Sequence, residues 1–88
     1  MSKVYLALQD NDEARYIVEA IEIDNPDISI SYAPAMIRLE NEDSLTINKA
    51  TVVEQLGRDW EIPELQLCLI TLGGNVEETD DSFSLTWN

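Results

Sequence analysis

The feature that most constrains the fold is a change in hydrophobic period along the chain. Ala14, Ile17, Val18 and Ile21 recur at the three- and four-residue spacing of one helix face. Beyond Asn25-Pro26, which is expected to end this helix near Asp24, apolar and polar side chains alternate instead. The alternating apolar positions are Ile28, Ile30 and Tyr32, then Ile37 and Leu39, then Leu45 and Ile47. Three half-buried strands joined by short antiparallel hairpins are therefore predicted.

Signals on either side of these strands predict the remaining elements. The run from Val4 to Leu8 predicts a buried first strand, and Thr51 with Glu54 has the capping-box spacing of a second helix ending at Gly57. Residues 65–72 form an apolar run that predicts a central strand, and residues 77–81 are acidic and predict a loop before a last strand. The expectation is an α+β fold: a single two-layer domain, residues 1–88, with two main helices, a mostly antiparallel sheet and the order β-α-β-β-β-α-β-β.

The charge balance restricts the possible partners. The chain has 18 acidic side chains, 5 basic ones and no histidine, for a formal charge of −13. Repulsion argues against nucleic-acid backbones and anionic membranes, and favours a protein partner with a basic rim. No apolar run approaches the ~20 residues that span a bilayer. The single cysteine, Cys68, rules out an internal disulfide, and such a small domain without disulfides is typical of the cytoplasm.

The residues that carry chemistry are few. Without histidine the chain lacks the commonest general base and metal ligand, and one cysteine cannot form a thiolate zinc site. We therefore expect no catalytic, cofactor-binding or metal-binding residues. Residues 10–12 begin like a calcium loop, but helix capping explains them better because the glycine and glutamate of such a loop are missing. Gly73-Gly74-Asn75 is either a structural turn or a shaped recognition loop.

Four ordered stretches then carry a family resemblance: residues 9–22, 34–38, 51–58 and 70–76. They are spread in order along nearly the whole chain, which resembles the effector (coupling or regulatory) proteins of bacterial multicomponent diiron monooxygenases. The phenol hydroxylase branch, in which this is the small P2-type component, is the most similar. The resemblance implies the fold of the monooxygenase regulatory proteins.

The resemblance also implies a function. Such a protein carries no cofactor, binds no small molecule tightly and is not itself an enzyme. It binds a diiron hydroxylase that converts phenol to catechol, while a separate reductase with FAD and a 2Fe–2S cluster supplies electrons from NADH. It modulates active-site access and couples NADH and O2 use to hydroxylation. We expect the partner contacts at two turns, and Glu13, Glu19 and Glu22 to point outward from the first helix. The contact residues expected at the turns are Pro34, Ala35 and Met36, and Gly73, Gly74, Asn75 and Val76.

Three alternatives belong to other functional classes. The chain could be an acidic protein-interaction or small-molecule-sensing α+β module unrelated to monooxygenases, or an acidic inhibitor that mimics nucleic acid. Asp43-Ser44-Leu45 also resembles the prosthetic-group site of acyl carrier proteins. That family is all-helical, however, and the alternation after Ser44 favours a strand.

Overall fold

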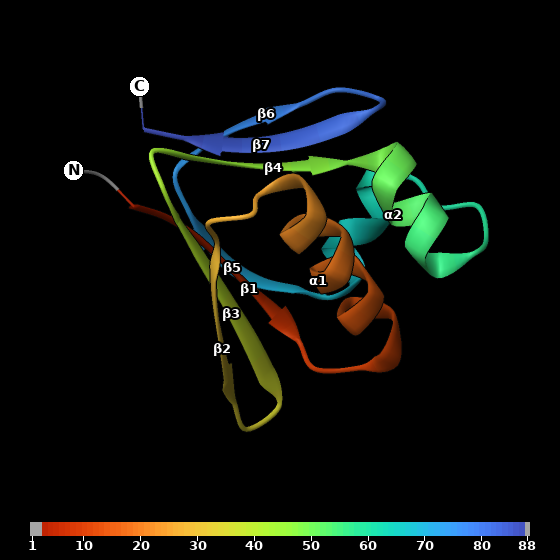
Figure 1. Cartoon of the computed structure of the whole chain (residues 1–88), viewed down its shortest axis with the longest axis horizontal. Coiled ribbons are helices and arrows are strands. Elements are labelled where there is room, and N and C mark those ends of the chain that lie inside the picture. The colour runs from red at the N-terminus through yellow and green to blue at the C-terminus, as the bar shows by residue number, and fades with distance from the viewer. Residues whose placement is uncertain (1–2, 88) are drawn as a thin grey trace.

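Two antiparallel sheets and two main helices make up the part of the chain that the computed structural model describes, residues 3–87. The ends of the expected 1–88 domain lie outside the described residues. In chain order the elements are β1 (Lys3–Gln9), α1 (Asp12–Asp24), β2 (Ser29–Ala33), β3 (Met36–Glu42), β4 (Ser44–Asn48), α2 (Lys49–Leu56), the 3-10 helix η1 (Ile62–Leu67), β5 (Leu69–Gly73), β6 (Asn75–Glu78) and β7 (Ser82–Thr86). The sheet orders are β2-β3-β1-β5 and β4-β7-β6 (Figure 1). This arrangement confirms the predicted α+β class, the antiparallel hairpin of β2 and β3, and the two main helices. The predicted hairpin between β3 and β4 is wrong, because these strands belong to different sheets, so the one expected sheet is divided into two.

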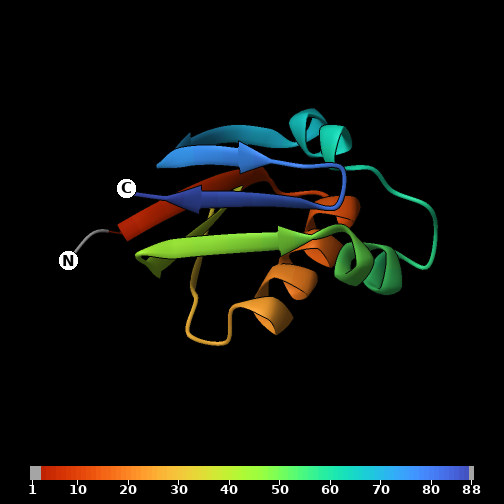
Figure 2. The same ribbon diagram turned by 90° about the horizontal axis from the view of Figure 1, so that it is seen from above.

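The core lies between the inner faces of the two sheets and α1. Leu6 and Leu39 are paired on the four-stranded sheet, Ile47 and Phe83 on the three-stranded sheet, and all four are fully buried. Ile17 contributes from the predicted apolar face of α1 and is also buried. Figure 2 shows the three-stranded sheet from above, with α2 following directly from the end of β4. The helical period and most of the alternation therefore predict which side chains form the core, but Tyr32, which the alternation places with Ile28 and Ile30, is 66% exposed.

Both ends of α1 are fixed by asparagine side chains. Asn11 caps the first turn, where its Oδ1 accepts from the N–H of Ala14 at 2.8 Å, as the helix-capping prediction requires. Asn25 follows the helix and is buried. Its Nδ2 donates to the carbonyls of Ile21 and Thr46 at 2.8 and 2.7 Å, and its Oδ1 accepts from the N–H of Thr46 at 3.0 Å. The side chain of Asn25 thus occupies the outer edge of β4 and ties the end of α1 to it.

The predicted start of the second helix is wrong. α2 begins at Lys49, directly after β4, and Thr51 lies within its first turn with no side-chain cap. The backbone N–H of Lys49 instead donates to the carbonyl of Asp81, at 2.8 Å, in the turn before β7. This long-range bond replaces the capping box that residues 51 and 54 suggested. The predicted end is confirmed, because Gly57 has the left-handed φ of +72°.

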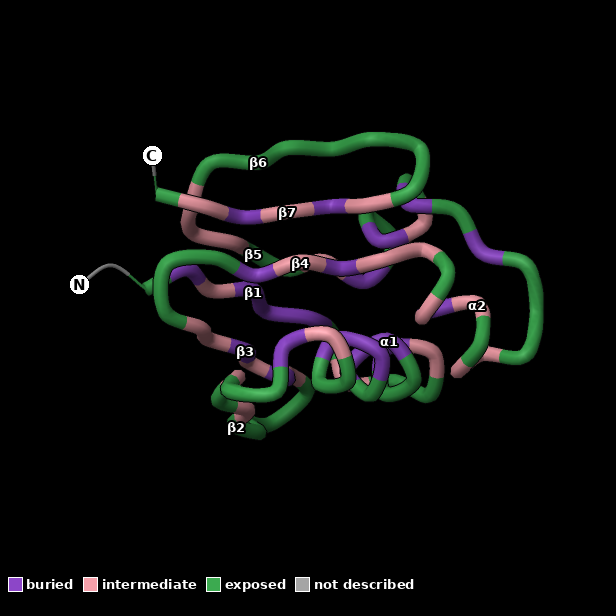
Figure 3. Tube along the Cα trace, turned by 45° about the horizontal axis from the view of Figure 1, so that its top comes forward, coloured by how far each residue is buried: buried purple, intermediate pink, exposed green. Residues whose placement is uncertain are grey.

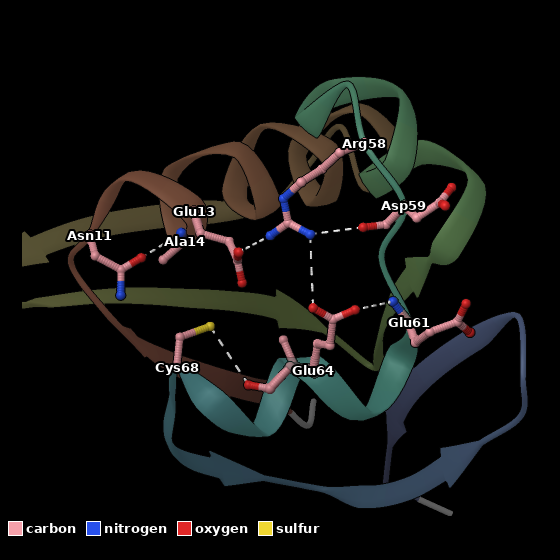
Figure 4. A network of polar contacts seen from close by, with 9 residues as sticks. Asn11, Glu13, Ala14, Arg58, Asp59, Glu61, Glu64 and Cys68 are labelled. Carbon is pink, nitrogen blue, oxygen red and sulfur yellow. Dashed lines mark hydrogen bonds and ion pairs between the residues drawn. The ribbon is translucent and has the colours of Figure 1, made fainter.

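The predicted central strand over residues 65–72 is also wrong. Its first part belongs to η1, and the strand β5 begins only at Leu69 and lies at a sheet edge. Figure 4 shows the polar contacts that hold the segment before β5. Arg58 forms an ion pair with Glu13 of α1, donates to the carbonyl of Asp59 at 2.8 Å and lies 3.8 Å from the carboxylate of Glu64. The N–H of Glu61 donates to Glu64 at 2.8 Å, which completes a capping box at the start of η1.

One strand was not expected. β6 occupies residues 75–78, so the acidic stretch predicted as a loop begins inside a strand and only residues 79–81 form the turn. β6 pairs with β7 on one side and is exposed along its whole length (Figure 3). Glu77 and Glu78 on such an edge discourage pairing with a further strand.

Candidate functional site

The first group of expected contact residues forms the two-residue turn between β2 and β3. Ala33 and Met36 are the last pair of the hairpin, and Pro34 and Ala35 between them are exposed. Pro34 fits the first turn position, while Ala35 has a φ of +63°, as the second residue of a type II turn does. The carbonyl of Ala35 accepts from the N–H of Asp10 at 3.2 Å. We call residues 34–36 the β2–β3 turn; it is exposed and is tied to the start of α1.

The second group forms the corner where the chain leaves one sheet for the other. Gly73 ends β5, Gly74 has a φ of +137°, and Asn75 and Val76 begin β6. A Cβ at Gly73 would overlap the ring of Tyr5, and one at Gly74 would lie 3.1 Å from Val4 Cγ1. Packing therefore favours glycine at position 73, and the φ of +137° favours it at position 74, whatever else this β5–β6 corner does. Val76 is 46% exposed although its register places it on the inner face.

The structure does not bring the two groups together. Met36 pairs with Gln9 at one end of β1, whereas Gly73 pairs with Tyr5 near the other. Four residues of strand separate these positions along β1, or about 13 Å. The two groups lie at opposite ends of the four-stranded sheet, as Figure 1 also shows. Met36 and Gly73 nevertheless belong to the same outer face, because Gln9 and Tyr5 point to the same side of β1.

Tyr5 and Arg38, which were not among the expected contact residues, lie between the β2–β3 turn and the β5–β6 corner. The guanidinium carbon of Arg38 lies over the Tyr5 ring, 4.4 Å from its centroid, and the same ring covers Gly73. The alternation in β3 does place Arg38 on the outer face with Met36. What the sequence does not reveal is the register of β1 against β3 and β5, which brings Tyr5 between Arg38 and Gly73.

The acidic face of α1 is partly engaged within the chain. Glu19 and Glu22 are exposed, as expected. Glu13 is half-buried and forms the ion pair with Arg58, so the expectation that it points freely outward is wrong (Figure 4). It also lies near Cys68. Burial first, and then the Glu13 carboxylate, raise the pKa of the Cys68 thiol, which therefore stays protonated and unreactive at neutral pH.

The rest of the described surface offers acidic and polar side chains for binding. Residues 3–87 contain no group of three or more histidine, cysteine or acidic side chains placed to hold a metal ion, and no helix among them is long and apolar enough to cross a membrane. A hollow of about 380 Å³ lies beside the end of α1, where Asp24, Asp27, Glu40 and Glu42 line it together with Lys3. Such a lining favours hydrated or cationic groups over apolar ligands. The arrangement offers binding surfaces built on rigid strands.

Known proteins resemble this chain over nearly its full length. It is 55% identical over 86 residues to the phenol 2-monooxygenase stimulatory component DmpM of Pseudomonas sp. (strain CF600), covering 98% of this chain and 96% of that protein. A chain in a solved phenol hydroxylase–regulatory protein complex matches with a TM-score of 0.94 and 47% identity, covering 99% of this chain and all of that one.

A more distant match shows how widely the fold is shared. The soluble methane monooxygenase regulatory protein B matches with a TM-score of 0.77 and 17% identity, over 98% of this chain and 65% of that one, which shows a common fold. Residues 2–86 match the sequence profile of the MmoB/DmpM family. With that match and the 55% identity, the chain belongs to the MmoB/DmpM family.

Proposed function

We propose that this chain is the regulatory (effector) component of a phenol hydroxylase-type multicomponent monooxygenase and acts by binding its hydroxylase. The observation that carries the proposal is the near full-length similarity to a stimulatory component and to a chain from a hydroxylase–regulatory protein complex. The exposed, rigidly held turns and the uncovered sheet face are consistent with a protein-binding role.

The proposed division of labour leaves the redox chemistry to the partners. The hydroxylase holds the diiron centre, the reductase holds FAD and the 2Fe–2S cluster, and this cytoplasmic chain, acting as one domain over residues 1–88, holds no cofactor. It acts by binding one conformation of the hydroxylase more tightly than another. A tenfold shift between two conformations requires about 1.4 kcal/mol of differential binding free energy. A domain that is already ordered can supply this difference with little loss of conformational entropy.

We place the contacts at the β2–β3 turn and the β5–β6 corner. Met36 is half-buried and adaptable, and Gly74 allows close backbone approach. An interface of standard size covers about 800 Å² on each partner, which is large enough to include both ends of the four-stranded sheet. The charge of −13 adds steering towards a basic docking face, so raising the salt concentration should slow association.

The decisive experiment is a titration of this protein into purified hydroxylase and reductase with phenol and NADH. We expect the catechol formed per NADH consumed to rise and then saturate at the binding stoichiometry. If the hydroxylase and reductase are active but this protein changes neither rate nor catechol yield per NADH, the proposal is overturned. The chain would then be an acidic interaction or small-molecule-sensing module.

Two single substitutions test the proposed contacts. Met36→Ala and Asn75→Ala should each weaken hydroxylase binding while leaving the circular dichroism melt nearly unchanged. If both variants bind and stimulate as the unmodified protein does, the contacts lie elsewhere. A variant with a lowered melting temperature and normal binding would assign that residue to the fold.

A further inference from the structure

Arg38 is held differently from the other two arginines. Arg15 donates to Asp10 at 2.9 Å, and Arg58 binds Glu13 and the carbonyl of Asp59. Arg38 lies on the Tyr5 ring and forms an ion pair with Glu40, whose N···O distance of 3.7 Å is beyond hydrogen-bonding distance. Within residues 3–87, no acceptor is hydrogen-bonded to its guanidinium, whose N–H donors are therefore available to a partner.

The support beneath Arg38 is rigid. The Tyr5 ring lies directly against Gly73, where even a Cβ would not fit, so the stack crosses from β5 through β1 to β3. Stacking orients the planar guanidinium without using its donors. Less side-chain entropy is lost when such a pre-oriented group binds a partner.

The stack also connects the two proposed contact regions. Arg38 is the next outward-facing residue after Met36 on β3, and Tyr5 is paired with Gly73 on β5. The outer face of this sheet is locally neutral, because Lys3 and Arg38 balance Glu40 and Glu42. The formal charge of −13 therefore falls on the rest of the chain.

We propose that Arg38 is the anchor with which the outer face of the four-stranded sheet docks on the hydroxylase, and that Tyr5 is its positioning residue. The inference rests on the proposed function. The partner surface that fits presents a carboxylate or carbonyl oxygen to Arg38 at its centre and is basic around it, which complements the net charge of −13 on the whole chain. Buried, well-packed arginines are common binding hot spots.

The test compares Arg38→Gln with Lys49→Gln, measuring the dissociation constant for purified hydroxylase. Both variants lose one positive charge, but Lys49 lies at the start of α2, paired with Glu61 on the other side of the core. We expect Arg38→Gln to weaken binding at least tenfold, chiefly through faster dissociation, and Lys49→Gln to stay within twofold. Arg38→Lys should restore little of the loss, because an ammonium lacks the planar fork.

Tyr5→Leu provides a second variant, because it keeps the donors of Arg38 but removes the surface that orients them. A three- to tenfold loss of affinity, with an unchanged circular dichroism spectrum, is expected. Equal losses for Arg38→Gln and Lys49→Gln would indicate a general charge effect and overturn the anchor. Normal binding of Arg38→Gln would overturn the anchor role of Arg38 and leave the proposed function standing. If the unmodified protein does not bind the hydroxylase, the proposed function is overturned as well.

Discussion

The outer faces of the two sheets differ in chemistry although both arise from the same alternation. On the four-stranded sheet the outer face carries Tyr5, Met36 and Arg38, a ring, a thioether and a stacked guanidinium. On the three-stranded sheet the corresponding positions of the β4–β7 pair carry serine, threonine and asparagine, such as Thr46 opposite Ser84. Side chains of this second kind hydrate well and offer no large anchor. The comparison teaches that an uncovered sheet face becomes a candidate interface through its few large side chains.

The sheets also differ in how they are fastened to the rest of the molecule. The edge strand β4 is bonded to α1 through both backbone groups of Thr46 and the side chain of Asn25. The four-stranded sheet is tied to the rest of the fold at its strand ends, where Trp87 Nε1 donates to the carbonyl of Lys3 at 2.5 Å and the N–H of Asp10 donates to the carbonyl of Ala35 at 3.2 Å. The side chains that cross its outer face join its own strands, Tyr5 over Gly73 and Arg38 over Tyr5. Changes on the two sheets should therefore separate loss of stability from loss of binding.

The largest expected effect is on the three-stranded side. Asn25→Ala removes three hydrogen bonds and leaves the partly buried N–H and carbonyl of Thr46 unpaired, so the free energy of unfolding should fall by about 3 kcal/mol. Urea denaturation measures this loss, and the folded fraction should bind the hydroxylase normally. Asn48→Ala is a matched control, because it removes one bond, to Asp24, and should cost less than 1 kcal/mol. Equal losses in the two variants would contradict the role given to Asn25.

Gly73→Ala should come next, and it should affect both properties. The new Cβ must displace the Tyr5 ring, which costs about 2 kcal/mol of stability and removes the support of Arg38. Thermal unfolding and hydroxylase binding of the same preparation test both consequences. Gly57→Ala is the control for a loss of stability alone, because its φ of +72° strains the new side chain while nothing lies within 4 Å of the new atom. Only Gly73→Ala should weaken binding.

A charge placed on each face tests the comparison itself. Ser31 is exposed opposite Arg38, and a glutamate there would pair with the guanidinium and occupy it. Ser31→Glu should weaken hydroxylase binding about tenfold, or about 1.4 kcal/mol. Ser84→Glu, on the three-stranded sheet, adds the same charge and should change the affinity less than twofold. A reversed order would move the docking face to the other sheet.

The smallest effect is expected at the β2–β3 turn. Ala35 holds a φ of +63°, which glycine adopts more readily, so Ala35→Gly should stabilise the fold by about 0.5 kcal/mol. Ala33→Gly, two residues earlier at the end of β2, should instead destabilise the fold by a similar amount. Differential scanning calorimetry of both variants would resolve opposite shifts. A lower melting temperature for Ala35→Gly would show that its methyl group packs usefully.

Most of the elements could be predicted from local pattern. The period of α1, its cap at Asn11 and its end at Asp24 follow from neighbouring residues, as do the hairpin around Pro34 and the C-terminal cap at Gly57. These features depend on contacts within a few residues, which is the range over which sequence periodicity carries information. The turns at Pro34-Ala35 and Gly73-Gly74 belong to the same category, because turn residues can be recognised without the rest of the fold, although Asn75 and Val76 lie in the unexpected strand β6.

The sequence predictions that were wrong concern elements fixed by contacts between residues far apart in the chain. α2 starts before Thr51 because the N–H of Lys49 donates to the carbonyl of Asp81. Residues 62–67 form η1 next to the ion pairs of Arg58 with Glu13 and Glu64. The Gly73–Tyr5–Arg38 stack likewise requires the register of three strands. The sequence by itself determined the periods, the caps and the net charge, because each is local or additive. Only the tertiary structure decided which outer face carries an oriented arginine, because strand register and long-range hydrogen bonds form between segments that no local pattern relates.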